Sequence, residues 1–402
     1  MTNKKSPIIL AFSGGLDTSF CVPWLKKTYK KPVITVTVDT GGINNEASKY
    51  LQKRSKQLGA DNHVLIDAKN DFFNEVLKYL IIGNIKKGQM YPLCVGSERG
   101  IQAKYLAKIA KEMGSSTIAH GCTAAGNDQV RFEIIIKTLA PDLEVLAPVR
   151  DHSWARKDQL DYLKKLNLPA PKSGSAYSIN RGLWGVTIGG SETLDSKETI
   201  PESAWELSSG AFSSPLNEKK IFIEFNQGVP VSINSEKLNP VNIIEKLELI
   251  GKGFGIGRGI HLGDTILGIK GRVAFEAPAA NILIAAHREL EKLTLTSQQL
   301  KTKDQISLQY CELIHEGKQL DPVCQDIQAL FTSSQKNVSG KVECLLRPGS
   351  IFVIGVESPF SLLSASKGKY GEAIGEWDAR DALGLSKILS LPGILYSRAK
   401  EK

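Results

Sequence analysis

Short apolar runs alternate with helical periods along the first half of the chain. Runs of strand length lie at 8–12, 33–38, 63–66, 117–120 and 144–147, and helical periods lie between them at 45–58, 71–82 and 98–113. In the last period, three- and four-residue spacing places Ile101, Tyr105, Ile109 and Met113 on one helix face. This alternation predicts an α/β fold with a doubly wound parallel sheet. Ligands bind beyond the carboxyl ends of the strands in such sheets, so the residues after each strand are the candidates for a site.

The second half has a mixed pattern that predicts an α+β arrangement. Runs at 221–225 and 229–233 flank a turn sequence, and Pro230 is expected to place the second strand at a sheet edge. A helix is expected to begin at Asn239 and to end at Gly251, and longer helical periods fill 278–317. A second hairpin is expected from 342–346 and 351–355.

Residues 169–219 are rich in proline, serine and glycine and show little periodicity. A loop of this length inside a domain is usually either functional or disordered. Tyr177, Ser178 and Trp184 favour a binding segment that reaches over the site of the first half, whereas a plain domain linker explains 191–215 as well. At the other end, residues 377–389 predict an amphipathic helix. Its apolar positions are Ala382, Leu385, Ile388 and Leu389.

At 402 residues the chain exceeds one ordinary core, so more than one domain is expected. We expect a nucleotide-binding domain at 1–168, a substrate domain at 169–360 and a tail at 361–402. The content of 42% hydrophobic and 23% charged residues is typical of soluble globular proteins. A strand-length apolar run follows the N-terminus and no run reaches membrane length, which predicts a cytoplasmic protein without signal peptide or membrane span.

Cysteine spacing and charge exclude further classes. The six cysteines form no C-x-x-C pair and have no histidine at metal spacing, so neither zinc nor a disulfide framework is expected and all six are predicted to be reduced. The net charge of +9 is spread through helices without a basic and aromatic stripe. It therefore favours attraction of anionic small molecules over a nucleic-acid or membrane partner.

The segment at 11–19, AFSGGLDTS, follows the first predicted strand and leads into a helix. Its glycines let the backbone approach phosphate oxygens, and the free N–H groups of the helix start face the anion. Ser13, Thr18 and Ser19 add hydroxyl donors, while Asp17 repels phosphate and is expected to hold Mg²⁺ or to orient the loop. The spacing fits neither a Walker A loop nor a G-x-G-x-x-G dinucleotide loop. The plain alternative is a strand-to-helix turn that uses glycine for geometry alone.

The segment at 120–133, HGCTAAGNDQVRFE, follows the fourth predicted strand. It combines small residues with an amide, a carboxylate and a guanidinium. Arg131 is suited to bidentate pairing with a carboxylate, and Asp128 to an ammonium group. Helix capping by Asn127 or Asp128 is the simpler reading of those two residues.

The pattern S-G-G-x-D-[ST] resembles the pyrophosphate loop of ATP-pyrophosphatases, which cleave ATP between the α- and β-phosphates. Together with 120–133 and LAPVRD at 146–151, it resembles argininosuccinate synthase. Further similar segments reach to position 279 at YPL 91–93, YSI 177–179, LWG 183–185, GIGR 255–258 and EAPA 276–279. The resemblance implies an adenine nucleotide α-hydrolase-like first domain, a synthetase domain, and a helical tail that joins subunits in a homotetramer. It also implies an ATP- and Mg²⁺-dependent ligase of arginine biosynthesis that joins citrulline to aspartate and releases AMP and pyrophosphate.

The resemblance also assigns residues to each substrate. The ATP set is Ala11, Phe12, Ser13, Gly14, Gly15, Leu16, Asp17, Thr18, Ser19, Val38 and Gly121, with Ser13 and Asp17 as the catalytic positions. The aspartate set is Thr123, Asn127 and Asp128. The citrulline set is Tyr91, Asn127, Arg131, Ser178 and Thr187. No general base is assigned, since positioning and charge neutralisation can carry the first step.

On the citrulline side Thr187 stands where the family has a serine, and three further positions depart from the family pattern. Gly96 stands where the family has a serine, and Phe275 stands where it has a tyrosine. Gly263 stands where the family has an acidic residue, and in this chain Asp264 follows it. A lost hydrogen-bond partner of a buried head group costs about 1–3 kcal/mol. The alternative is therefore the same chemistry with another ureido or carbonyl acceptor. A tRNA-modifying enzyme would need a reactive cysteine pair and an RNA-binding appendage, and a silent nucleotide sensor is disfavoured by the intact loop at 13–19.

Overall fold

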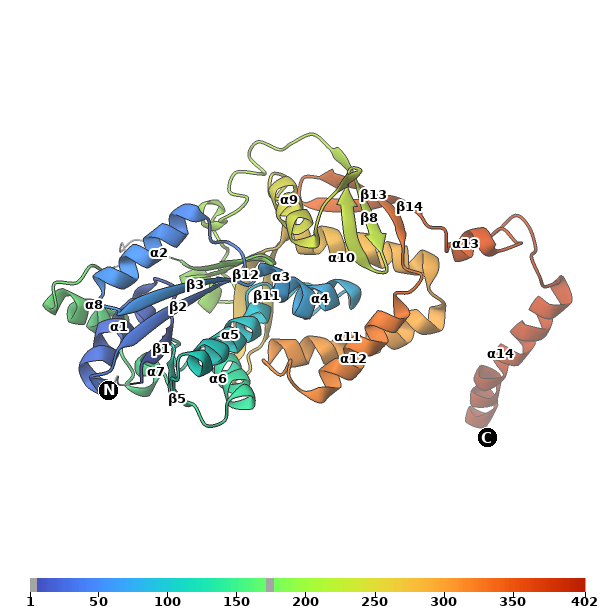
Figure 1. The fold of residues 1–402 in the computed structure, drawn as a ribbon. Coiled ribbons are helices and arrows are strands. Elements are labelled where there is room, and N and C mark those ends of the chain that lie inside the picture. The colour runs from blue at the N-terminus through green and yellow to red at the C-terminus, as the bar shows by residue number, and fades with distance from the viewer. Residues whose placement is uncertain (1–5, 171–176, 402) are drawn as a thin grey trace.

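The parallel sheet expected in the first half is confirmed by the computed structural model, which describes residues 6–170 and 177–401 (Figure 1). Its strands are β1 Ile8–Ala11, β2 Val33–Asp39, β3 Asn62–Asp67, β4 Thr117–Ala119 and β5 Glu144–Leu146. Their order is β3-β2-β1-β4-β5 with all neighbours parallel. The chain order changes direction at β1, which lies between β2 and β4. A ligand site is therefore expected beyond the carboxyl ends of these three strands.

Helices cover both faces of this sheet because alternate β1 residues are apolar on both sides. Ile8 and Leu10 pack in a cluster with Phe20 of α1, whereas Ile9 packs in a second cluster with Leu106 of α5. The helices here are α1 Leu16–Tyr29, α2 Asn45–Gln57, α5 Arg99–Glu112, α6 Asp128–Leu139, α7 Pro148–Asp151 and α8 Arg156–Lys165. The helical period at 71–82 is α3 Lys69–Phe72, a π-helical turn at Phe73–Leu77 and α4 Lys78–Ile82.

The predicted apolar face of α5 is only partly right. Ile101 is buried, but the other fully buried side chains are those of Ala103, Leu106 and Ala110. Tyr105 instead turns to the edge of the core, where its hydroxyl hydrogen-bonds to Asp71. Small alanines carry the close contact with the sheet, which a search for large apolar residues overlooks.

The expectation of a loop or linker over residues 169–219 is wrong for much of this segment. Two strands, β6 Ser178–Gly182 and β7 Gly185–Gly189, form a hairpin that joins β11 Arg258–Asp264 and β12 Lys270–Glu276 in an antiparallel sheet of order β11-β12-β7-β6. An irregular stretch with two 3₁₀ turns, Ser191–Leu194 and Glu202–Ala204, follows β7. Val186 and Ile188 of β7 are buried against Trp205 of this stretch, so it is packed and is not a free linker. Trp184 is buried between the strands and donates from Nε1 to the carbonyl of Pro92 at 2.9 Å.

A second antiparallel sheet contains both predicted hairpins. Its order is β10 Glu236–Lys237, β9 Val229–Ile233, β8 Lys219–Asn226, β13 Gly340–Arg347 and β14 Ser350–Glu357. The two-residue strand β10 covers β9, so the prediction that the strand of Pro230 is the edge strand is wrong. Pro230 is tolerated because β10 pairs only with Ser232 and Ile233, and because the β8–β9 register shifts beside Phe225, its partner.

Four helices belong to this half of the chain: the first two pack against the sheet, and the second and fourth pack against α4. They are α9 Pro240–Lys252, α10 Pro278–Thr294, α11 Ser297–His315 and α12 Pro322–Ser334. Asn239 caps α9 as expected by accepting from the Asn242 N–H at 2.9 Å, but the helix runs one residue past Gly251. The long period at 278–317 is two helices because Thr296 forms a capping box with Gln299.

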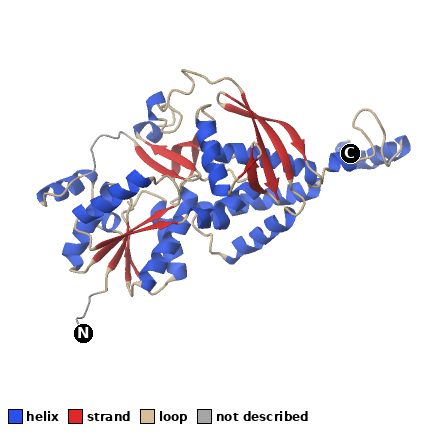
Figure 2. Cartoon of the chain, turned by 45° about the horizontal axis from the view of Figure 1, so that its top comes forward, coloured by secondary structure: helices blue, strands red, loops and turns tan. Residues whose placement is uncertain are grey.

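The C-terminal tail leaves the body of the protein (Figures 1 and 2). It holds α13 Leu362–Ala365 and α14 Ala379–Lys400, which begins and ends later than the predicted 377–389. No residue of α14 is buried, and Leu385 and Leu389 are 58% and 70% exposed. In the ranges 6–170 and 177–401, no helix is long and apolar enough to cross a membrane.

Candidate active site

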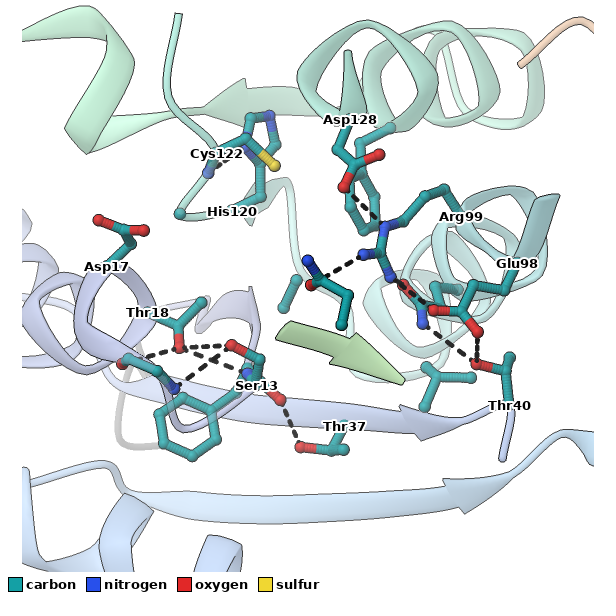
Figure 3. Close-up of a pocket in the computed structure, with 18 of the residues that line it drawn as sticks. Ser13, Asp17, Thr18, Thr37, Thr40, Glu98, Arg99, His120, Cys122 and Asp128 are labelled. Atoms are coloured by element: carbon teal, nitrogen blue, oxygen red, sulfur yellow. Dashed lines mark hydrogen bonds and ion pairs between the residues drawn. The ribbon is translucent and has the colours of Figure 1, made fainter. Parts of the chain in front are cut away.

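The turn between β1 and α1 forms one wall of a cavity of about 620 Å³. Gly14 has a φ of +73°, which favours glycine, and a Cβ there would lie 2.7 Å from Leu51 Cδ2, so that the Leu51 side chain would have to shift. Thr18 closes the turn. Its Oγ1 accepts from the Ser13 N–H at 3.3 Å and lies 3.2 Å from Ser13 Oγ (Figure 3).

Some of the predicted ATP residues in this turn line the cavity, and the others lie behind it. Lining residues are Ala11, Phe12, Ser13, Gly15, Asp17 and Thr18. Gly14, Leu16 and Ser19 lie behind them. Ser19 is fully buried, donates to the Gly14 carbonyl and accepts from Arg54 Nε at 3.1 Å. Its hydroxyl therefore holds the turn in place from beneath.

The other strand ends reach the same cavity. Val38 at the end of β2 lines it, and so does Gly121 after β4. A Cβ on Gly121 would lie 3.0 Å from the backbone nitrogen of Thr18, which shows how closely this loop approaches the start of α1. The switch point of the sheet thus contains the cavity, as the strand order requires.

Asp17 stands clear of the hydrogen bonds of the turn (Figure 3). Its carboxylate lines the cavity, and it makes no hydrogen bond or ion pair with another residue of 6–170 or 177–401. The described residues contain no group of three or more metal-ligating side chains. Mg²⁺ in nucleotide sites takes one or two carboxylates with the substrate phosphates, so a lone carboxylate beside a phosphate loop fits this ion.

Arg99 links two carboxylates on the wall opposite the turn (Figure 3). Its Nε donates to Asp128 Oδ2 at 2.9 Å, and its Nη1 donates to Glu98 Oε1 at 2.9 Å and to Gln102 Oε1 at 3.0 Å. Burial favours the neutral acid, yet Arg99 and Arg131 lower the pKa of Asp128 to about 2. Asp128 is therefore a fixed negative charge at neutral pH.

Glu98 is the second carboxylate of this wall. It is 3% exposed, and its Oε2 accepts from the Thr40 hydroxyl at 2.8 Å. Burial raises the pKa of Glu98 to about 7 against the opposite influence of Arg99 and Thr40. The β6–β7 hairpin covers it so closely that a Cβ on Gly182 would collide with Oε2.

The loop after β4 places its predicted residues in different surroundings. Thr123 and Asp128 line the cavity. Asn127 is not among the lining residues, and its Oδ1 accepts from the Ile266 N–H at 3.0 Å. His120 lines the cavity with its Nδ1 accepting from the Cys122 N–H at 3.3 Å. Burial, with Arg150 nearby, lowers the pKa of His120 to about 4, so its imidazole is neutral.

Arg131 lies behind the cavity wall and is engaged within the chain. Its Nη1 donates to Asp128 Oδ1 at 2.8 Å, and its Nε donates to the carbonyl of His315 in α11 at 2.8 Å. The bidentate carboxylate contact foreseen for its guanidinium is therefore not available in this conformation. Arg131 acts here as a second cation for Asp128.

The remaining predicted citrulline residues are split between the cavity and a buried aromatic group. Ser178 of β6 lines the cavity. Tyr91 is 7% exposed and lies outside the lining, with its ring stacked on His261 at 5.5 Å and 5.2 Å from the Phe275 ring. Thr187 pairs with Phe275 between β7 and β12 and so borders this group.

Neighbouring side chains fill the space at the three substituted positions. A Cβ on Gly96 would lie 3.1 Å from Arg131 Cζ, and one on Gly263 would lie 2.5 Å from His261 Nε2. The Phe275 ring lies over Gly259 in the adjacent strand, where no Cβ would fit. At Gly96 and Gly263 the chain's own side chains thus occupy space that a larger residue would need.

Sequence reasoning missed Glu98, Arg99 and Gln102 as cavity residues. The sequence feature that could have identified them is a Glu-Arg pair at the start of a helix, shortly after Tyr91. The six cysteines are free, as predicted. Cys122 alone of them lines the cavity, and burial raises its pKa to about 12, which keeps it a thiol.

Comparison with known proteins agrees over nearly the whole chain. A family model described as "Arginosuccinate synthase N-terminal HUP domain" matches residues 7–169, and one described as "Arginosuccinate synthase C-terminal domain" matches residues 177–396. The argininosuccinate synthase of Dictyoglomus thermophilum is 38% identical over 398 residues, which is 98% of each chain. Those of Methanocaldococcus jannaschii and Methanothermobacter thermautotrophicus are 37% and 38% identical, again over 98% of each chain. The chain therefore belongs to the argininosuccinate synthase family.

Proposed function

We propose that this protein is an ATP-dependent, AMP-forming ligase that joins citrulline to aspartate. The proposal rests on one observation: a single cavity brings together the glycine turn of Ser13 to Thr18 and the Arg99–Asp128 pair. The first suits the phosphates of ATP and the second suits a charged amino acid. Full-length relatives named argininosuccinate synthase support the same activity.

ATP fits the cavity with its phosphates on the turn. The N–H groups at the start of α1 and the hydroxyls of Ser13 and Thr18 face the phosphates, and Val38 borders the adenine. Asp17 would hold Mg²⁺ beside the phosphates. When bound, the ion neutralises charge that develops on the leaving pyrophosphate.

Aspartate binds beside Thr123 and Asp128, and citrulline binds near Ser178, which are the residues of the two predicted sets that line the cavity. The ureido oxygen of citrulline attacks the α-phosphate, and pyrophosphate leaves. The amine of aspartate then displaces AMP at the activated carbon. The chain's part in both steps is to hold the reacting atoms in line and to keep water out.

A pyrophosphate assay on the purified protein tests this function. ATP, Mg²⁺ and aspartate are supplied with and without citrulline, and the released nucleotide is identified. Pyrophosphate and AMP should form only with citrulline. ADP as the product, or release that another ureido compound supports and citrulline does not, contradicts the proposal.

Assembly and location extend the proposal. The apolar residues of α14 are exposed in the single chain, and we infer that they bury against other copies in a cytoplasmic homotetramer, as the family resemblance implies. We also propose that the domain boundaries lie between residues 168 and 169 and between residues 360 and 361.

A further inference from the structure

The cavity holds a buried carboxylate, that of Glu98, for which the two steps above have no use. Glu98 lines the same cavity as Ser13, Thr18 and Thr123, and its side chain is 4% exposed. A carboxylate buried to this degree is costly unless it is paired or functional. Its contacts do pair it, with one hydrogen bond to each oxygen, from Arg99 to Oε1 and from Thr40 to Oε2.

Arg99 retains donors for a substrate. Its Nε and Nη1 are committed to Asp128, Glu98 and Gln102, whereas among the described residues Nη2 has one acceptor, Asn180 Oδ1 at 3.5 Å. A carboxylate that enters the cavity can accept from Nη2. The ammonium group of the same amino acid then lies beside the carboxylates that Arg99 bridges.

We propose that Glu98 is the general base that removes a proton from the aspartate ammonium group before the amine attacks. The inference rests on the proposed function. The proton passes from nitrogen to the Glu98 carboxylate, and the freed lone pair forms the new C–N bond. The C–O bond to the α-phosphate breaks, its electron pair leaves with AMP, and the second proton lost by the nitrogen leaves with the AMP phosphate.

The other titratable residues of the wall serve this role poorly. Arg99 and Arg131 keep the pKa of Asp128 at about 2, which makes it a weak base. His120, with a pKa lowered to about 4, is weaker than Glu98, and Cys122 stays protonated. Charges that face Glu98 are Arg99 on its own segment, Asp128 on α6 and Asp39 on β2, and Lys69 neutralises Asp39 at 3.0 Å.

A split assay of the two half-reactions tests the role. Citrulline-dependent exchange of pyrophosphate into ATP reports the first step and needs no aspartate, whereas product formation needs both steps. Glu98→Gln should keep the exchange within threefold and lower product formation by about 10²-fold or more. Glu98→Asp should recover part of the loss. Glu75→Gln removes an exposed carboxylate paired with Lys104 of α5 and should change neither rate.

The pH profile provides a readout that a structural role would not move. Product formation should fall in the wild type as the pH drops below about 7, because Glu98 then holds a proton. Thr40→Val removes a donor that stabilises the charged form, so the acid limb should move to higher pH. Equal losses in both half-reactions, or product formation by Glu98→Gln within tenfold of the wild type, overturn the inference. A wild type without citrulline-dependent exchange overturns the proposed function, and the inference falls with it.

Discussion

The Arg131 guanidinium occupies the space that a side chain at Gly96 would need. An added Cβ would lie 3.1 Å from Cζ and 3.2 Å from Nη1 and Nη2 of the guanidinium. Arg131 uses this position to reach the His315 carbonyl 184 residues away, and it thereby joins the first half of the chain to α11. The absence of a side chain at position 96 thus leaves the room that Arg131 needs for its contact with α11.

Restoring the serine should improve citrulline binding. Gly96→Ser adds a hydroxyl where the family pattern has one, and a hydrogen bond of about 1 kcal/mol lowers the KM for citrulline about fivefold. Gly96→Ala adds the same Cβ and displaces Arg131 by the same few tenths of an ångström without the hydroxyl. Steady-state kinetics on both variants separates the effects. An equal change in the two variants would show that only space matters at this position.

Asp17→Ala should abolish pyrophosphate release while the protein keeps its melting temperature. The carboxylate lines the cavity and has no partner among the described residues, so its loss removes a ligand of Mg²⁺ without disturbing the core. We expect a decrease of about 10²-fold or more in the rate. Asp17→Asn, which keeps the shape, should be equally slow. Normal turnover by either variant would exclude a role for Asp17.

Thr123→Ala should raise the KM for aspartate about fivefold and leave the KM for ATP within twofold. The side chain is exposed at the cavity wall near Asp128, so a single hydrogen bond of about 1 kcal/mol is lost and no packing. Initial rates at varied aspartate and varied ATP provide the two constants. A similar increase in both would contradict the division of the cavity between the substrates.

The parallel sheet and the glycine turn could be predicted because their signals are local. Apolar runs of strand length and S-G-G-x-D-T lie within a few residues of one another, and β1 buries residues on both faces. The sheet β11-β12-β7-β6 could not, because its strands pair across Val186 and Glu276, far apart in the sequence. Its edge strand β6 has only exposed residues before Gly182 and so lacks the alternation that marks a half-buried strand.

The cavity residues follow the same division. Ser13, Thr18, Thr123 and Asp128 lie in the turns and helix starts that follow β1 and β4, where the fold class itself directs the search. Glu98 ends a 3₁₀ turn and Arg99 begins α5, and their place in the site depends on Thr40, which follows β2 and donates to Glu98. Arg131 was placed in the correct segment, which the structure shows as the start of α6, but its contact with the His315 carbonyl depends on α11, which the sequence does not connect to that segment.

Lys303→Met should destabilise the protein by about 3–5 kcal/mol. Lys303 Nζ lies 2.9 Å from Glu291 Oε2 with both side chains buried, so the substitution leaves a buried carboxylate without its cation. The free energy of unfolding in urea measures the loss at one protein concentration. Lys301→Met, on the exposed side of the same helix, should change it by less than about 0.5 kcal/mol. Equal values would mean that the buried pair carries no charge.

The double substitution Leu385→Asp and Leu389→Asp should convert the assembly into smaller species. Both side chains are largely exposed in the single chain, so the exchange costs no core packing within it. In an assembly held together by α14, two buried carboxylates without partners would each be strongly unfavourable. Light scattering coupled to size exclusion should show a lower mass for this variant than for the wild type. Lys387→Ser on the same helix is the control and should keep the wild-type mass. A monomeric wild type, or an unchanged mass in the double variant, would place the subunit contacts elsewhere.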